Sequence, residues 1–271
     1  MSSVPVVPRN GLIEGSWEFL AHALAVAESE IRKLAHDPIE MAARIVQPLT
    51  WLLLFAPVFS HLREIPTGGI RYTDFVVPGI LAQGVLFISV VYGVALLWER
   101  DAGILQRYLA TPASRGALVL GKALSAGVRV LPQAFFIYVL SLILGVKMRL
   151  SPLALLGVMA FVLLGAAVFS TLSLIIACLA KTRERFMGIN QLLTLPFFFA
   201  SNAIYPVSLM PTWLRTVSSI NPLTYMVDGL RALMLTQAHS TFGIRTDFAV
   251  QVPILLLFLA IATKLYHRVS Y

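Results

Sequence analysis

Charged residues are scarce in this sequence, and cysteine occurs once. Asp, Glu, Lys and Arg make up 13% of the 271 residues, whereas hydrophobic residues make up 58%. Soluble domains carry about 25% charged residues, so this composition excludes an ordinary soluble protein. Cys178 is the single cysteine, which excludes a disulfide bond within the chain. Long apolar runs with so little charge indicate an integral membrane protein, and no stretch between the runs is long enough for a soluble domain.

The sequence also lacks the patterns of metal, catalytic and nucleic-acid sites. Its five histidines are scattered without metal-ligand spacing, and no Ser, His and Asp set shares a plausible face. The net charge of +8 comes without a basic run interleaved with aromatics, so the basic residues of cytoplasmic loops explain it. Residues 1–40 lack the apolar core of a signal peptide. We expect no enzyme activity, no cofactor or metal on this chain, and no nucleic-acid partner.

About six segments are long and apolar enough to cross a bilayer, which takes roughly 20 residues. If the N-terminus lies in the cytoplasm, most of the 21 lysines and arginines fall on the cytoplasmic side, as the positive-inside rule requires. The sequence predicts an all-α integral membrane protein with both termini in the cytoplasm, an N-terminal segment over 1–40 and one membrane domain over 41–271. The predicted spans are Met41–Leu62, Phe75–Trp98, Ala117–Gly145, Leu153–Ala180, Met187–Pro206 and Phe248–Tyr266.

The segment Ser16–His36 is too polar to span the membrane. Trp17, Leu20 and Leu24 recur near helical spacing between charged residues. This pattern predicts an amphipathic helix on the inner membrane face, and an ordinary cytosolic helix is the alternative. Asp37-Pro38 separates it from the first span.

The segment Glu99–Arg115, which lies between the second and third spans, reads ERDAGILQRYLATPASR. The charge rule places this loop in the cytoplasm. Thr111-Pro112 ends any helix in the loop, because proline cannot continue one. A short amphipathic helix on a tight loop offers a surface that a partner protein can hold. Its apolar positions are Ile104, Leu105, Tyr108 and Leu109, which fall at helical spacing.

The stretch Gly116–Ala123 matches most of a phosphate-binding P-loop but fails at its last position. Ala123 stands where a Ser or Thr hydroxyl would hold magnesium. The stretch also opens a membrane span rather than following a strand. Lys122 is better explained as an anchor at the inner membrane face, so we expect no ATP site on this chain.

The long loop over 207–247 carries two predicted short helices, Pro211–Ile220 and Leu223–Leu235. Asn221-Pro222 between them fits a helix cap followed by a first-turn proline. Short helices keep their backbone hydrogen-bonded at membrane depth, so we expect both to dip into the outer leaflet or to lie along it. Asp228 and Arg231 are spaced i, i+3 and are expected to pair.

Arg129 is the one charge deep in a predicted span. It is either functional or reaches back to the inner headgroups. The lack of intramembrane carboxylates argues against an ion-coupled transporter. The aromatic run Phe197–Phe199, with Asn202, either lines an apolar substrate path or serves lipid contact and helix packing.

Three motifs carry a resemblance to a known family. They are Glu99–Gly103 with Leu109–Arg115, Gly121-Lys122, and Pro211–Arg215 with Asn221–Tyr225 and Val227–Arg231. The chain resembles the permease subunits of type-two ATP-binding-cassette exporters, of the daunorubicin-resistance and nodulation lipo-oligosaccharide kind. The family usually has Glu where Asp101 stands, and Asp keeps the charge.

This resemblance implies a pore made with a second permease, identical or related, in the lipid of a bacterial cytoplasmic membrane. Two copies of a separate ATPase subunit would bind ATP and Mg and hold 99–115 as a coupling helix, while outer re-entrant helices over 207–247 cap the exit. The implied ATPase-coupling residues are Glu99, Arg100, Asp101, Gly103, Leu105, Arg107, Tyr108, Leu109, Thr111 and Pro112. The implied outer motif is Trp213, Asn221, Pro222, Tyr225, Asp228 and Arg231, and the possible substrate path is Trp51, Phe55, Phe87, Phe197, Phe198 and Asn202.

The expected cargo is a hydrophobic or amphipathic compound, such as a drug, an antibiotic or a lipid-like molecule. Export of a polysaccharide or glycolipid by the same family is the alternative. A secondary transporter or a membrane-embedded enzyme is the more distant alternative.

Overall fold

The structure is a computed structural model that describes residues 46–266 except 56, 59–68, 105–114 and 181. The regular secondary structure within these residues is helical, apart from one isolated bridge between Met148 and Leu235. The four long helices are α4 (Tyr72–Asp101), α6 (Arg115–Ile143), α7 (Pro152–Leu179) and α11 (Ile244–Leu265). The shorter ones are η1 (Trp51–Phe55), α8 (Arg183–Phe199), η2 (Val207–Leu209), α9 (Thr212–Ile220) and α10 (Pro222–Met234).

Four helices of the described part are long and apolar enough to cross a membrane: α4, α7, α11 and the Leu118–Ile143 part of α6. These helices coincide with four of the predicted spans. The first predicted span is described only in part, as the short apolar helix Val46–Phe55. The six-span total therefore stays a prediction, and so does the amphipathic helix over 16–36, which lies outside the described residues.

The fifth predicted span, Met187–Pro206, was placed wrongly at its end. The helix found there, α8, has 17 residues and starts four residues earlier, because the Thr182 hydroxyl accepts a hydrogen bond from the Arg185 amide and caps it. It ends at Phe199, where the amide of Ser201 donates to the Phe198 carbonyl and the chain turns. Apolar composition alone extended the prediction through this turn.

Local signals in the sequence set the other helix ends. The Ser151 hydroxyl caps α7 by accepting from the Ala154 amide. Asn221 caps α10 through the Leu223 amide, at 2.9 Å, with Pro222 in the first turn, as predicted. Gly145, with a φ of 71°, follows the end of α6, since glycine adopts this left-handed conformation without strain.

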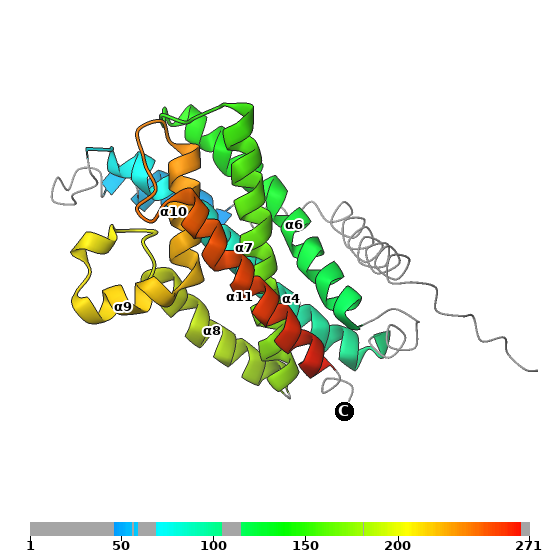
Figure 1. Cartoon of the computed structure of the whole chain (residues 1–271). Coiled ribbons are helices and arrows are strands. Elements are labelled where there is room, and N and C mark those ends of the chain that lie inside the picture. Colours follow the sequence, from blue (N-terminus) through cyan, green and yellow to red (C-terminus); the bar gives the residue numbers. More distant parts are fainter. Residues whose placement is uncertain (1–45, 56, 59–68, 105–114, 181, 267–271) are drawn as a thin grey trace, which may run out of the picture.

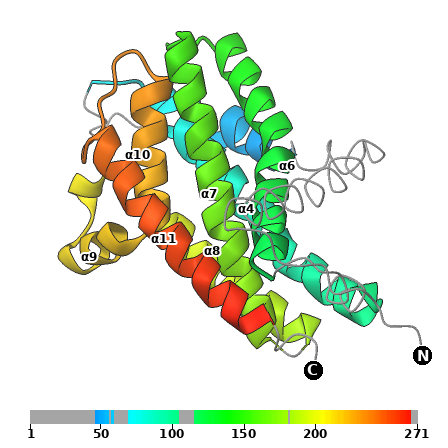
Figure 2. The same ribbon diagram turned by 45° about the vertical axis from the view of Figure 1, so that its right-hand side comes forward.

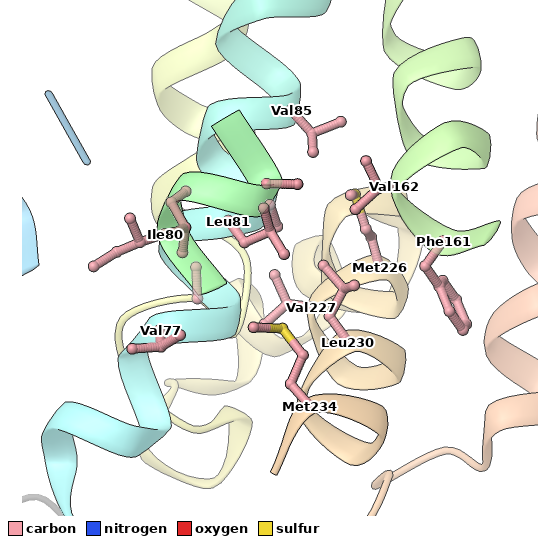
Figure 3. Packing of buried hydrophobic residues seen from close by; sticks show 14 of the residues in the cluster. Val77, Ile80, Leu81, Val85, Phe161, Val162, Met226, Val227, Leu230 and Met234 are labelled. Carbon is pink, nitrogen blue, oxygen red and sulfur yellow. The ribbon is translucent and has the colours of Figure 1, made fainter. Parts of the chain in front are cut away.

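Helix α7 lies at the centre of the bundle and packs against α4, α6, α10 and α11 (Figures 1 and 2). Figure 3 shows the core where α4, α7 and α10 meet, with Leu81, Val162 and Leu230 facing one another. Helix α10 is enclosed by protein on most sides. Its depth in the membrane stays a prediction.

Small residues allow the closest helix contacts. A Cβ on Gly79 of α4 would lie 2.3 Å from the carbonyl oxygen of Ala203, just after α8. A Cβ on Gly229 of α10 would lie 2.3 Å from the Phe161 ring of α7. Membrane helices that approach this closely use small residues, because packing rather than the hydrophobic effect drives their association.

The two ends of the bundle differ in which helices begin and end there. At the basal end, α4, α7 and α11 end while α6 and α8 begin (Figures 1 and 2). At the opposite, distal end, α4, α7 and α11 begin, α6 and α8 end, and α9 and α10 lie beside them.

Candidate functional site

An ion pair at the basal end joins α4 to α6. The Lys122 ammonium donates to both carboxylate oxygens of Glu99, at 2.6 and 2.8 Å. The Lys122 side chain is 5% exposed and that of Glu99 is 12% exposed. Glu99, Arg100 and Asp101, expected in a loop, form the last turn of α4 instead. Lys122, expected as a headgroup anchor, therefore has a protein partner.

A second ion pair joins α4 to α8. Arg183 donates to Asp101 Oδ2 through Nε, at 2.9 Å, and through Nη2, at 2.5 Å. Its guanidinium carbon also lies 3.9 Å from the centre of the Trp98 ring, close enough for a cation–π contact. Arg100 binds the other oxygen of Asp101 at 3.0 Å. We call Trp98, Glu99, Asp101, Lys122 and Arg183 the basal cluster.

The basal cluster fixes the two ends of the predicted coupling segment. Gly103, with a φ of 69°, turns the chain after α4, and the chain returns at Arg115, where α6 begins. Because Glu99 and Lys122 hold α4 to α6, a force on the segment between them would act on both helices together. The predicted coupling residues Leu105, Arg107, Tyr108, Leu109, Thr111 and Pro112 lie outside the described residues.

The P-loop-like stretch Gly116–Ala123 lies within α6. A phosphate cradle needs a loop whose backbone amides point at the ligand. Beyond the first turn of an α-helix, the amides bond to carbonyls of the preceding turn, so those from Val119 to Ala123 are not free for a ligand. This supports the prediction that the match is a coincidence.

Arg231 is the central buried cation of the distal end. Its Nη2 donates to the Asn202 carbonyl at 2.7 Å and its Nε to the Phe75 carbonyl at 3.4 Å. The guanidinium lies 3.8 Å from the centre of the Phe75 ring. Burial lowers the pKa of Arg231 to about 10, while the nearby Asp228 acts in the opposite direction, so the group stays charged at neutral pH.

Asp228 does not pair with Arg231, so that prediction was wrong. Its Oδ2 accepts from the Ser240 hydroxyl at 2.7 Å and from the Phe242 amide at 3.1 Å. Asp247 of α11 shares the same hydroxyl, at 2.9 Å, and both carboxylates are fully buried. The pairing failed because the loop after α10 folds back over Asp228, while Arg231 faces α4.

The remaining outer-motif residues have structural contacts. Asn221 donates its amide to the Phe197 carbonyl at 2.7 Å, which ties the start of α10 to the last turns of α8. The Tyr225 hydroxyl donates to the Ser219 carbonyl at 2.7 Å, and its ring contacts Phe242. Trp213, in contrast, is 68% exposed on α9. Of these residues, Asn221 and Tyr225 help to fix the turn between α9 and α10, together with the 3.0 Å contact between the Ser218 and Thr224 hydroxyls.

The residues of the predicted substrate path lie in separate parts of the structure. Trp51 contacts Phe55 and Phe198, with ring centres 4.5 and 6.1 Å apart. Phe197 instead faces Phe169 of α7. Phe87 is half-buried on α4 and makes no ring contact with them. Asn202 belongs to the distal end with Arg231.

Sequence reasoning missed Arg183, Ser240 and Asp247. The predicted last span began at Phe248, one residue after Asp247, so the carboxylate was left in a loop. Arg183 was counted only as a cytoplasmic charge. Arg129, the charge predicted inside a span, lies 5.6 Å from the Tyr92 ring centre.

The described part of the chain is a helical bundle with four helices of spanning length, and its ion pairs lie toward the ends. These features define an integral membrane protein. The chain belongs to the ABC-2 type transporter family, whose model matches residues 22–235. As a member, it is the membrane subunit of an ABC transporter and works with an ATPase subunit.

Curated relatives agree with this family. A putative transport permease ycf38 of Cyanophora paradoxa is 31% identical over 230 residues, covering 84% of this chain and 78% of the relative. The daunorubicin resistance ABC transporter permease protein DrrB1 of Streptomyces coeruleorubidus is 24% identical over 248 residues, covering 89% and 86%. Nodulation protein J of Rhizobium leguminosarum bv. trifolii is 29% identical over 170 residues, covering 62% and 64%.

Proposed function

We propose that this permease exports a hydrophobic or amphipathic compound, such as a drug, an antibiotic or a lipid-like molecule. Two copies of a separate ATPase subunit hydrolyse the ATP, and a second permease, identical or related, completes the pore. The similarity to a daunorubicin resistance permease supports this cargo class. The proposal places the basal end in the cytoplasm of a bacterial cell, because the positive-inside rule favours that orientation.

The observation that carries the proposal is the basal cluster. A chain that responds to ATP without binding it needs contacts that differ between the states of its partner. The pairs Glu99–Lys122 and Asp101–Arg183 join the end of α4, where the coupling segment 99–115 begins, to α6 and α8. Movement of that segment by the ATPase would therefore shift three helices together.

The test uses the sequence pattern of the coupling segment. Leu105→Asp and Tyr108→Asp each place a charge on its predicted apolar face, and Gln106→Asp places the same charge on its polar face. We expect the first two to lower co-purification of the ATPase at least about tenfold, since burying a charge in a packed contact costs several kcal/mol. The control should retain the ATPase. Normal co-purification and transport in both test variants would contradict the coupling role.

The cargo class is tested separately, in inverted membrane vesicles supplied with ATP. We expect ATP-dependent accumulation of daunorubicin or of a fluorescent phospholipid, and its loss when the ATPase is inactivated. Stimulation of ATP hydrolysis by a lipid-linked oligosaccharide, without stimulation by either probe, would replace this cargo with a glycolipid. Transport by the permease alone, without any ATPase, would contradict the proposed mechanism.

A further inference from the structure

A cavity of about 360 Å³ lies at the distal end of the bundle. This volume is within the range of about 300–1,000 Å³ of small-molecule sites. The cavity reaches from the surface to a buried cation, because its rim residues are exposed and its inner wall is not. The inner wall includes Phe75, Asn202 and Arg231, and the rim includes Ser208, Gln237 and His239.

The guanidinium of Arg231 has donors to spare in this cavity. An arginine carries five N–H donors, and the contacts of Arg231 are two neutral carbonyls and the face of the Phe75 ring. Among the described residues no carboxylate forms an ion pair with it. Asp228, one turn earlier, is held by Ser240 and Phe242 instead. A buried cation in this state favours an anion as its partner.

Asn202 forms part of the inner wall and fixes the position of the cation. Its side chain is 2% exposed, and its backbone carbonyl accepts from Arg231 Nη2 at 2.7 Å. The guanidinium is therefore held at one place beside the cavity while its remaining donors stay available.

We propose that this cavity binds a phosphate-type headgroup that carries no cation of its own, such as a phosphoglycerol. Arg231 binds the anionic oxygens. The site joins the start of α4, the chain after α8 and the last turn of α10, so an occupied cavity ties these three elements together. The inference goes beyond the proposed function because binding needs neither ATP nor the ATPase.

A purely structural Arg231 is the alternative, since its two carbonyl partners already hold α4 and the chain after α8 to α10. A variant that blocks the cavity without touching Arg231 separates the two roles. Val207 lines the cavity from η2, so Val207→Trp fills the space. Leu209 belongs to the same short helix, is 49% exposed and does not line the cavity. Leu209→Trp is therefore the matched control.

The experiment titrates the full-length permease, held in phosphatidylcholine nanodiscs, with three soluble probes by calorimetry. The probes are dihexanoyl phosphatidylglycerol, inorganic phosphate and dihexanoyl phosphatidylcholine. We expect phosphatidylglycerol to bind at least about tenfold more tightly than phosphatidylcholine, because the choline cation neutralises the phosphate of its own headgroup and would lie beside the buried Arg231. Arg231→Gln and Val207→Trp should each remove that preference, whereas Leu209→Trp should keep it.

The arms distinguish the source of the headgroup. If inorganic phosphate binds as tightly as phosphatidylglycerol, the natural ligand is a soluble anion. If inorganic phosphate binds much more weakly, the natural ligand is a membrane lipid. Equal affinity for the two lipids would overturn the proposal. Retention of the preference in Val207→Trp would also overturn it, and this result stands even if Arg231→Gln does not fold.

Discussion

The basal and distal ends of this bundle differ in how they connect buried charges to neighbouring helices. At the basal end, Lys122 meets Glu99 directly and Arg183 meets Asp101. At the distal end, Asp228 and Arg231 are three residues apart on one helix, yet each turns to neutral groups on other segments. Ion pairs join helices to each other at the basal end. At the distal end the one ion pair among the described residues, Arg71–Asp74, stays within the start of α4, and backbone and hydroxyl groups hold Asp228 and Arg231.

This difference fits two tasks. A segment that transmits force needs helices that move together, and paired charges across helices give that connection. A site that receives a ligand needs charge that the protein has not neutralised, at a fixed position. The distal end meets that need, because carbonyls hold the Arg231 guanidinium in place without cancelling its charge.

The largest effect is expected at the Glu99–Lys122 pair. Lys122→Met leaves a nearly buried carboxylate without its partner, which costs about 3–5 kcal/mol in unfolding free energy. Adding Glu99→Gln should restore most of that stability, because no unpaired charge remains. Unfolding in mixed micelles titrated with SDS measures both. If the double variant were no more stable than Lys122→Met alone, the Glu99–Lys122 pair would not be what stabilises the basal end.

The next effect tests whether close backbone contact holds the distal end. Gly79→Ala would place a methyl group 2.3 Å from the Ala203 carbonyl oxygen, and we expect a loss of about 2–3 kcal/mol. The control is Gly188→Ala, on α8, where an added Cβ meets nothing within 4 Å. Helix propensity alone would make both changes favourable. If Gly79→Ala left the free energy of unfolding unchanged, the chain after α8 would have shifted to make room for the methyl group, and the close contact would not hold the distal end.

A double-mutant cycle at the distal end is the direct counterpart of the basal rescue. Arg231→Gln loses hydrogen bonds to two carbonyls and should cost about 2 kcal/mol. Adding Asp228→Asn should not recover it, with an interaction energy below about 1 kcal/mol, because the two side chains share no contact. The SDS titration used for the basal pair measures the cycle. A rescue as large as the basal one would remove the contrast between the ends.

The smallest effect on stability is expected at Arg183. Arg183→Lys keeps the charge but loses the two-point contact with Asp101 and the planar contact with Trp98. This pair is partly exposed, so the thermal midpoint of the purified permease should hardly change. Under the coupling role we expect transport per ATP hydrolysed to fall instead. A lower midpoint with unchanged transport would make Arg183 a packing residue only.

Much of the fold followed from local sequence rules. Four spans, the cap at Asn221-Pro222 and the two short helices before the last span were all predictable, because hydropathy, caps and prolines act over a few neighbouring residues. The end of α8 was not, since apolar residues continue through the turn after Phe199. The burial of Asp247 was missed for a related reason, because α11 starts four residues before its apolar run.

The partners of the charged residues depended on the tertiary structure. The i, i+3 spacing of Asp228 and Arg231 allowed a pair, but α4 and the 240–242 segment each offer a better-placed partner. Lys122 and Glu99 are 23 positions apart, and no local rule relates them. The sequence by itself determined a helical membrane protein, its family and the charged segment between the second and third spans, because composition and short motifs carry that information. Packing alone decided which charges neutralise each other and that a cavity lies beside Arg231, because those features require residues distant in sequence to meet.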